Sequence, residues 1–84
     1  MSNIIKYALS TEKSLKMMES ENKLIFVVDK NSSKAEIREA IQTTFKAKVV
    51  KINTLIDSKG RKKAYVKFTA DKPAIDIATQ LGLM

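Results

Sequence analysis

Hydrophobic and polar residues follow a different rhythm in each part of this chain. Residues 23–29 form an apolar run rich in β-branched side chains, which predicts a strand that is buried on both faces and lies centrally in its sheet. Further along, Ser33 and Glu36 stand at the spacing of a helix capping box, and hydrophobic residues then recur with helical periodicity as far as Phe45. This second pattern predicts a helix that packs one apolar stripe against the sheet.

Two further segments show the period-two alternation of strands. They span residues 48–56 and 63–69 and enclose the turn-forming residues 57–60, so they predict a β-hairpin. The hairpin would bury Val50, Ile52 and Ile56 from its first strand and Ala64, Val66 and Phe68 from its second. Its opposite face would carry Lys51, Asn53, Tyr65 and Lys67, with Lys59, Arg61, Lys62 and Lys63 at the tip.

Shorter helices are predicted near the two ends of the chain. Residues 10–19 begin with polar cap candidates, and a last amphipathic helix follows Asp71 and Pro73 and closes at Gly82. A helix between the first strand and the hairpin favours a parallel crossover, with the last strand inserted between the other two. The predicted fold class is α+β: a small, mainly antiparallel sheet with a split β-α-β arrangement and two to three helices packed on it, as a single domain over residues 1–84.

Charge is concentrated in one part of the chain. The net charge of +7 arises entirely within residues 46–67, which contain eight Lys or Arg and one acid, Asp57. A local excess of this kind predicts a polyanion bound at one place, and nucleic acid is the commonest such partner. A strand surface with an aromatic residue leans toward RNA, although DNA stays open at this point. The predicted binding residues are Lys46, Lys48, Lys51, Asn53, Thr54, Lys59, Arg61, Lys62, Lys63, Tyr65 and Lys67.

The sequence contains few residues of the types that serve catalysis or metal binding. The chain has no His and no Cys, which removes the commonest general base and the commonest metal ligands, so no cofactor and no metal are predicted. Glu36 and Glu39 are better explained as solvated helix charges than as a hydrolytic pair. No apolar run approaches the ~20 residues of a membrane span, and no signal peptide is indicated, which predicts a soluble intracellular protein.

One RNA-binding alternative comes from the RNA recognition motif. The match to this motif is incomplete. Lys62 and Lys63 stand at the positions of its glycine and its first stacking aromatic, and the strand that closes its fold after the last helix is missing. This motif gives the runner-up interpretation, a binder of single-stranded RNA that uses Tyr65 as a stacking platform. Five residues fit the RNP1 pattern of this motif: Arg61, Ala64, Tyr65, Val66 and Phe68.

Four segments, taken in order and spacing, resemble the L twenty-three family of large-subunit ribosomal proteins. They are Ser-Thr-Glu-Lys-Ser at 10–14, Ser-Lys-Ala-Glu-Ile at 33–37, Val-Lys-Ile-Asn-Thr-Leu at 50–55 and Lys-Lys-Ala-Tyr-Val at 62–66. The resemblance covers nearly the whole chain. It implies a non-enzymatic, cytoplasmic protein that binds large-subunit ribosomal RNA beside the polypeptide exit tunnel, next to ribosomal protein L twenty-nine.

The same resemblance implies residue roles and partners. It places RNA contacts on Lys51, Asn53, Thr54, Lys62, Lys63 and Tyr65. Glu12 matches the glutamate that receives the chaperone trigger factor in bacterial relatives, and the family surface also docks the signal recognition particle and the protein-conducting channel. Only residues 56–61 stand where bacterial members carry a long extension, so the chain is more similar to the archaeal form. That form favours the signal recognition particle over trigger factor.

Overall fold

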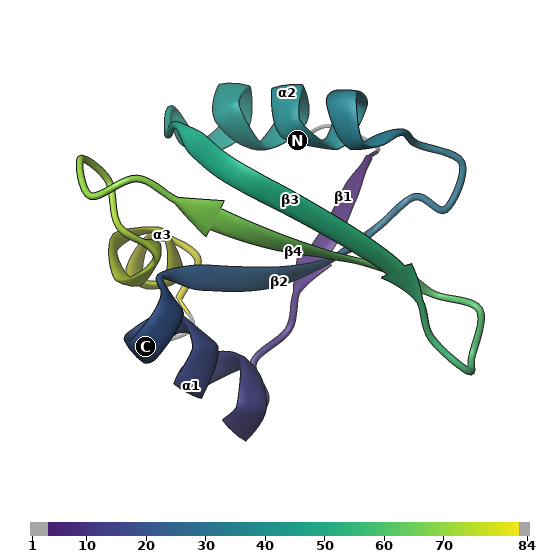
Figure 1. Cartoon of the computed structure of the whole chain (residues 1–84), viewed down its shortest axis with the longest axis horizontal. Helices are drawn as coiled ribbons and strands as arrows, with labels where there is room; N and C mark the ends of the chain where they lie inside the picture. The colour runs from purple at the N-terminus through teal and green to yellow at the C-terminus, as the bar shows by residue number, and fades with distance from the viewer. Residues whose placement is uncertain (1–3, 83–84) are drawn as a thin grey trace.

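The computed structural model describes residues 4–82, which form a four-stranded antiparallel sheet and three helices (Figure 1). The strand order β1-β2-β4-β3 places β4 between β2 and β3, and every neighbouring pair is antiparallel. β2 and β3 therefore run parallel to each other, and the predicted α+β fold with its split β-α-β unit is confirmed. The strands are β1 (Ile5–Ala8), β2 (Lys23–Val28), β3 (Val49–Ile56) and β4 (Lys62–Phe68), and the helices are α1 (Glu12–Glu21), α2 (Lys34–Phe45) and α3 (Ala74–Gln80).

Local capping explains where the two longer helices begin. The predicted capping box of α2 is confirmed: Ser33 Oγ accepts the Glu36 N–H at 3.2 Å, and Glu36 Oε1 accepts the Ser33 N–H at 2.9 Å. α1 has a second capping box, in which Thr11 and Ser14 exchange the same kind of hydrogen bonds. Each helix thus satisfies two backbone donors at its first turn with its own side chains.

Asn22 ends α1 and joins it to two other elements. Its backbone is left-handed, with φ 57°, a conformation that asparagine adopts more readily than most residues. Its Nδ2 donates to the Phe68 carbonyl at 2.7 Å, and its Oδ1 accepts the Ala74 N–H at 2.7 Å. One side chain therefore ties the end of α1 to the end of β4 and caps the first turn of α3, where Pro73 offers no side-chain cap.

The hydrophobic core lies on one face of the sheet, which we call the covered face. All three helices contribute buried side chains to it, and Phe26 of β2 packs against Phe45 of α2 with ring centroids 5.7 Å apart. Figure 1 shows α1 and α3 lying together while α2 lies apart from them. The opposite face carries no helix among the described residues, and we call it the open face. Core residues on the covered face include Leu24, Phe26, Val28, Ala64, Val66 and Phe68.

β3 departs from the predicted alternation at a β-bulge. Val49 pairs with Phe68 and Lys51 pairs with Lys67, so Val50 is the extra residue. The Val50 side chain is 54 % exposed, whereas Val49 is buried. The prediction that Val50 lies in the core is wrong, because the bulge shifts the buried position by one residue.

Side chains of α2 hold this bulge in place. Gln42 Oε1 accepts the Val49 N–H at 3.2 Å, and Arg38 Nη2 donates to the Val49 carbonyl at 2.8 Å. Both backbone groups of the residue before the extra position are therefore satisfied by the helix that packs on β3.

The prediction that Ile56 is buried is also wrong. Ile56 lies opposite Lys62 at the last pair before the turn and is 62 % exposed. The last described core residue of β3 is Ile52. Beyond it the two strands continue past the helices toward the turn (Figure 1), so the alternation persists without anything to cover it.

Candidate nucleic-acid interface

The open face presents its side chains in rows that run across neighbouring strands. The row nearest α1 contains one lysine from each of three strands: Lys23, Lys67 and Lys51. The middle row contains Ile25, Tyr65 and Asn53. The row nearest the hairpin turn contains Tyr7, Val27, Lys63 and Leu55. This register confirms that Lys51, Asn53, Tyr65 and Lys67 share a face.

The lysine row is electrostatically unfavourable in the free protein. Like charges directly opposite each other on neighbouring strands repel. Lys23 Nζ forms an ion pair with Glu21 at 3.3 Å, but Lys51 and Lys67 are exposed and have no ion pair within the described part of the chain. The bulge in β3 is what places Lys51 opposite Lys67. A bound anion would relieve this repulsion, so the row is chemically suited to phosphate groups.

The middle row gives the surface an aromatic centre. Tyr65 is half-buried, and its strand neighbours are the buried Ile25 and the exposed Asn53. The RNA recognition motif stacks bases on paired aromatics, whereas Ile25 stands beside Tyr65 here and Lys63 lies two residues away on the same strand. Tyr65 can therefore contact one base, with Asn53 in place to bond to its edge or to a sugar.

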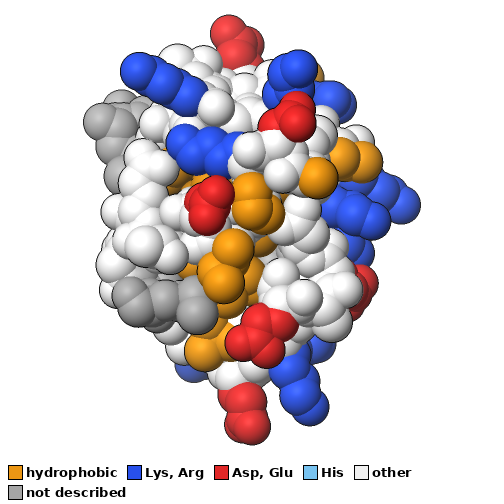
Figure 2. Space-filling model, turned by 90° about the vertical axis from the view of Figure 1, so that its left-hand side faces the viewer, with side chains coloured by type: hydrophobic (Ala, Val, Ile, Leu, Met, Phe, Trp, Pro, Cys, Tyr) orange, Lys and Arg blue, Asp and Glu red, His pale blue; other side chains and the backbone are white. Residues whose placement is uncertain are grey.

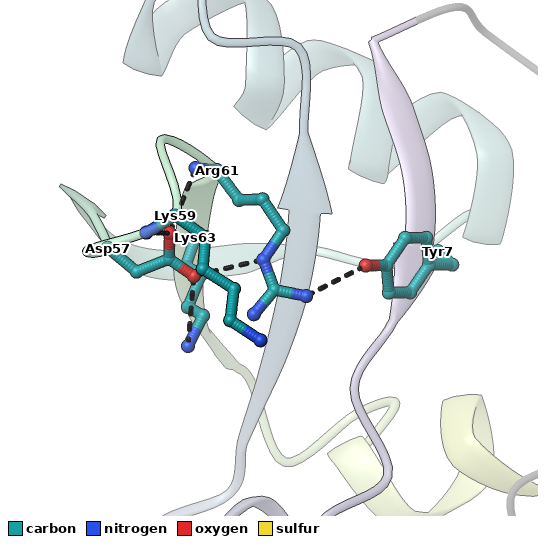
Figure 3. A network of polar contacts seen from close by, with 5 residues as sticks. All are labelled: Tyr7, Asp57, Lys59, Arg61 and Lys63. Atoms are coloured by element: carbon teal, nitrogen blue, oxygen red, sulfur yellow. Dashed lines mark hydrogen bonds and ion pairs between the residues drawn. The ribbon is translucent and has the colours of Figure 1, made fainter.

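A polar network organises the turn (Figure 3). Asp57 Oδ1 accepts the N–H groups of Lys59 and Arg61, both at 2.9 Å. Asp57 Oδ2 accepts Arg61 Nε at 3.0 Å and lies 3.6 Å from Lys63 Nζ. Arg61 Nη1 then donates to the Tyr7 hydroxyl at 3.3 Å, so its side chain crosses β2 to reach β1.

The same network shifts the acidity of its charged members. The hydrogen bond from the Arg61 backbone N–H is the largest cause of a lowered Asp57 pKa. Burial opposes it, and the Arg61 side chain and the Lys59 N–H add further hydrogen bonds that lower the pKa. Hydrogen bonds to Tyr7 and then to Asp57 raise the pKa of Arg61. Both groups therefore stay ionised, and the guanidinium keeps its charge beside the open face.

The structure separates the predicted binding residues into groups. Lys51, Asn53, Lys63, Tyr65 and Lys67 lie together on the open face, and Lys59 and Arg61 belong to the turn. Lys46 and Lys48 are exposed between the end of α2 and the start of β3, at the opposite end of the hairpin from the turn. The predicted docking residue Glu12 is exposed in the first turn of α1.

Thr54 and Lys62 do not share the open face. Strand alternation points both toward the covered face, with Thr54 opposite Ala64 and Lys62 opposite Val28. Lys62 Nζ donates to the Ser32 carbonyl at 2.6 Å. The predicted grouping of Lys62 with the other bases at the tip is wrong, because the strand turns it toward the loop before α2.

Two residues of this surface escaped sequence analysis. Tyr7 was missed because β1 is four residues long and its alternation is interrupted by a register shift between Ile5 and Tyr7. Lys23 was missed because it is the first residue of an apolar run, and such a run gives no alternation from which its position on the open face could be predicted. The β-forming residues around Tyr7 were the only available signal for β1.

One end of the molecule lacks this charge pattern. On the end of the molecule seen in Figure 2, acidic and basic side chains are interspersed around a band of hydrophobic side chains, and Lys and Arg gather along one edge of the view. Within residues 4–82, no three His, Cys, Asp or Glu side chains are grouped to hold a metal ion. None of the described helices is long and apolar enough to cross a membrane.

Comparisons with known proteins agree on one family. The model of the family described as Ribosomal protein L23 matches residues 3–75. The large ribosomal subunit protein uL23 of Trypanosoma brucei brucei is 44% identical over 81 residues, which cover 96% of this chain and 49% of that protein. The uL23 protein of Pyrobaculum aerophilum is 42% identical over 81 residues, covering 96% of this chain and 100% of that protein. The chain thus spans about half of the trypanosome relative and the full length of the archaeal one.

Proposed function

The chain belongs to the ribosomal protein L23 family, and from this premise we propose that it binds large-subunit ribosomal RNA through the open face of its sheet. Members of the family are structural components of the large ribosomal subunit and not enzymes. The protein would act as a single domain over residues 1–84, within the large subunit in the cytoplasm.

The lysine row is the observation that carries this proposal. Lys67 and Lys51, which have no ion pair among the described residues, repel each other in the free protein, and RNA phosphates would replace that repulsion with attraction. Each phosphate contact also releases condensed counterions, which makes binding strong at low salt and weak at high salt. A row of cations across three strands therefore fits an RNA backbone better than it fits an apolar protein partner.

The remaining open-face residues supply contacts of other kinds. Tyr65 offers a ring on which a base can stack, and Asn53 offers an amide that can bond to a sugar or a base edge. Lys63 and the turn residues Lys59 and Arg61 extend the cationic surface beyond the sheet, and Lys46 and Lys48 extend it at the other end. Thr54 and Lys62 point toward the covered face and are not part of this open-face surface.

The location of the protein in the subunit follows from the family resemblance and is part of the proposal. We place it beside the polypeptide exit tunnel, next to ribosomal protein L twenty-nine, as a docking platform for the signal recognition particle and the protein-conducting channel. Glu12 lies at the exposed start of α1, on a helix that packs on the covered face. Factors could therefore reach Glu12 while RNA occupies the open face.

A pair of charge reversals tests the RNA-binding face. The double variant Lys51→Glu, Lys67→Glu should bind large-subunit ribosomal RNA much more weakly, and the slope of log affinity against log salt should fall by roughly 1.5 to 2 for two lost phosphate contacts. The matched control is Lys16→Glu, Lys34→Glu, which changes the net charge equally at two exposed helix positions. Equal losses in the two variants, or no loss in the first, would overturn the assignment of the open face.

A further inference from the structure

A second basic feature lies beside the hairpin turn, where three distant parts of the chain meet. A cavity of about 270 Å³ opens between Lys6 of β1, the end of β2 with the following Lys30, and Arg61 of the turn. We call it the notch. Ligand pockets for drug-sized molecules begin at about 300 Å³, so the notch suits a smaller group such as part of one nucleotide.

The notch is cationic, and only part of its charge comes from the basic segment 46–67. Lys6, Lys30, Arg61 and Lys62 line it together with one acid, Asp29. Lys6 and Lys30 come from outside the basic segment 46–67, are exposed, and form no ion pair within residues 4–82. Asp29 Oδ1 already accepts the Asn31 N–H at 3.1 Å. Folding thus adds two cations to the basic segment at this point and leaves a net positive site.

Arg61 is held in a fixed orientation at the edge of the notch. Its Nε is bound to Asp57 and its Nη1 to Tyr7, while its Nη2 has no hydrogen bond within the described part of the chain. Two fixed nitrogens orient the plane of the guanidinium, which reduces the entropy lost when the third nitrogen binds an anion. Figure 3 shows the side chain stretched across β2 between these two partners.

Tyr7 places an aromatic ring next to this cation. It is 47% exposed and lies in the same open-face row as Val27 and Lys63. Because Arg61 binds its hydroxyl, the ring and the guanidinium are neighbours across β2. A phosphate at Arg61 would therefore bring an attached base within reach of the Tyr7 ring, where stacking is tolerant of base identity.

We propose that the notch binds one unpaired nucleotide of the RNA, with its phosphate between Arg61, Lys6 and Lys30 and its base stacked on Tyr7. This inference rests on the proposed RNA-binding function and extends it to a second site. Phosphates on the lysine row would bind by backbone contact alone, whereas the notch requires a nucleotide that is free to leave its helix.

Two neutralising substitutions test the phosphate half of the site. The variant Lys6→Gln, Lys30→Gln should bind large-subunit ribosomal RNA about tenfold more weakly at low salt, with a salt slope lower by roughly 1.5. The control Lys13→Gln, Lys16→Gln removes the same charge from exposed positions of α1 and should bind as the unmodified protein does. Equal affinities for the two variants would overturn the notch. Such a result would not affect the proposal that the open face binds RNA. That proposal fails only if the Lys51→Glu, Lys67→Glu variant binds no more weakly than its control.

A mononucleotide tests the base half. Adenosine 5′-monophosphate, titrated while the protein is followed by NMR, should shift the Tyr7 ring signals together with the Lys6 and Arg61 signals. Inorganic phosphate should shift Lys6 and Arg61 equally but shift the ring signals much less than the mononucleotide does, because it brings no base to stack on Tyr7. Tyr7→Phe, which keeps the ring and loses the bond to Arg61, should weaken both titrations. A ring that does not respond to the mononucleotide, or notch signals that respond to neither ligand, would contradict the proposal.

Discussion

The two faces of the sheet use the same strands, yet different forces hold their side chains. On the covered face, residues such as Phe26 and Phe68 are 1% exposed and pack against helices. On the open face, Ile25 and Val27 are also only 3% exposed, but they lie outside the core cluster, among Tyr and Lys neighbours in the sheet. Burial stabilises both faces, but on the open face the aligned lysines oppose it. The contrast indicates that the covered face maintains the fold, whereas the lysine row of the open face does not.

The largest expected effect comes from opening the covered face. Phe68→Ala removes a buried ring and should lower the free energy of unfolding by about 3–5 kcal/mol, measured by chemical denaturation. Phe68→Leu keeps most of the volume and should cost clearly less. A Phe68→Ala loss as small as that of an exposed site would mean that the covered face does not maintain the fold.

A smaller effect is expected on the open face, in binding instead of stability. Tyr65→Ala should weaken RNA binding by about 1–3 kcal/mol through lost stacking, measured at a fixed salt concentration. Tyr65→Phe keeps the ring and should retain most of the affinity. If a folded Tyr65→Ala protein binds RNA as tightly as the unmodified chain, the aromatic centre of this face has no role in binding.

The bulge permits a sharper comparison between neighbouring residues. Val49→Ala removes buried methyl groups and should cost about 1.5 kcal/mol of unfolding free energy, at ~0.8 kcal/mol for each buried carbon. Val50→Ala, one residue along and exposed, should change stability very little. Thermal or chemical unfolding of both variants tests the bulge. Without a bulge, Val50 would be buried and Val50→Ala would be the more destabilising substitution.

The smallest effect concerns the turn and appears in the pH dependence of stability. The pKa of Asp57 is lowered in the folded protein, so its contribution is fully present above its unfolded pKa of about 3.9 and is lost as the pH falls through the folded value. Unfolding of the native chain and of Asp57→Asn should therefore differ near neutral pH and converge in acid. A difference that stays constant with pH would show that the charge of Asp57 does not hold the turn.

Sequence patterns predicted the covered face better than the open one, for a physical reason. The stripe that ends at Phe45 and the alternation through Val66 report burial, which each residue expresses through its own hydrophobicity. Ser33 and Glu36 signalled the start of α2 because a cap is a local interaction. Val50 was misplaced because the bulge depends on contacts from α2, which no local pattern contains.

The sequence predicted only those site residues whose charges are close together along the chain. The basic segment pointed to the hairpin, but Lys6 and Lys30 join the turn through folding alone, because acids elsewhere balance their charge in any count along the chain. Tyr7 became visible only when β1 paired with β2. Such contributions depend on which distant segments meet, and that is decided by packing.

The bulge also affects how the free protein can associate with other copies of itself. β3 is an edge strand, and an open edge invites pairing with a second chain and hence aggregation. Arg38 and Gln42 occupy both backbone groups of Val49, and the extra residue bends the strand where another chain would align. The bulge that places Lys51 opposite Lys67 therefore also hinders a second chain from pairing at the start of β3.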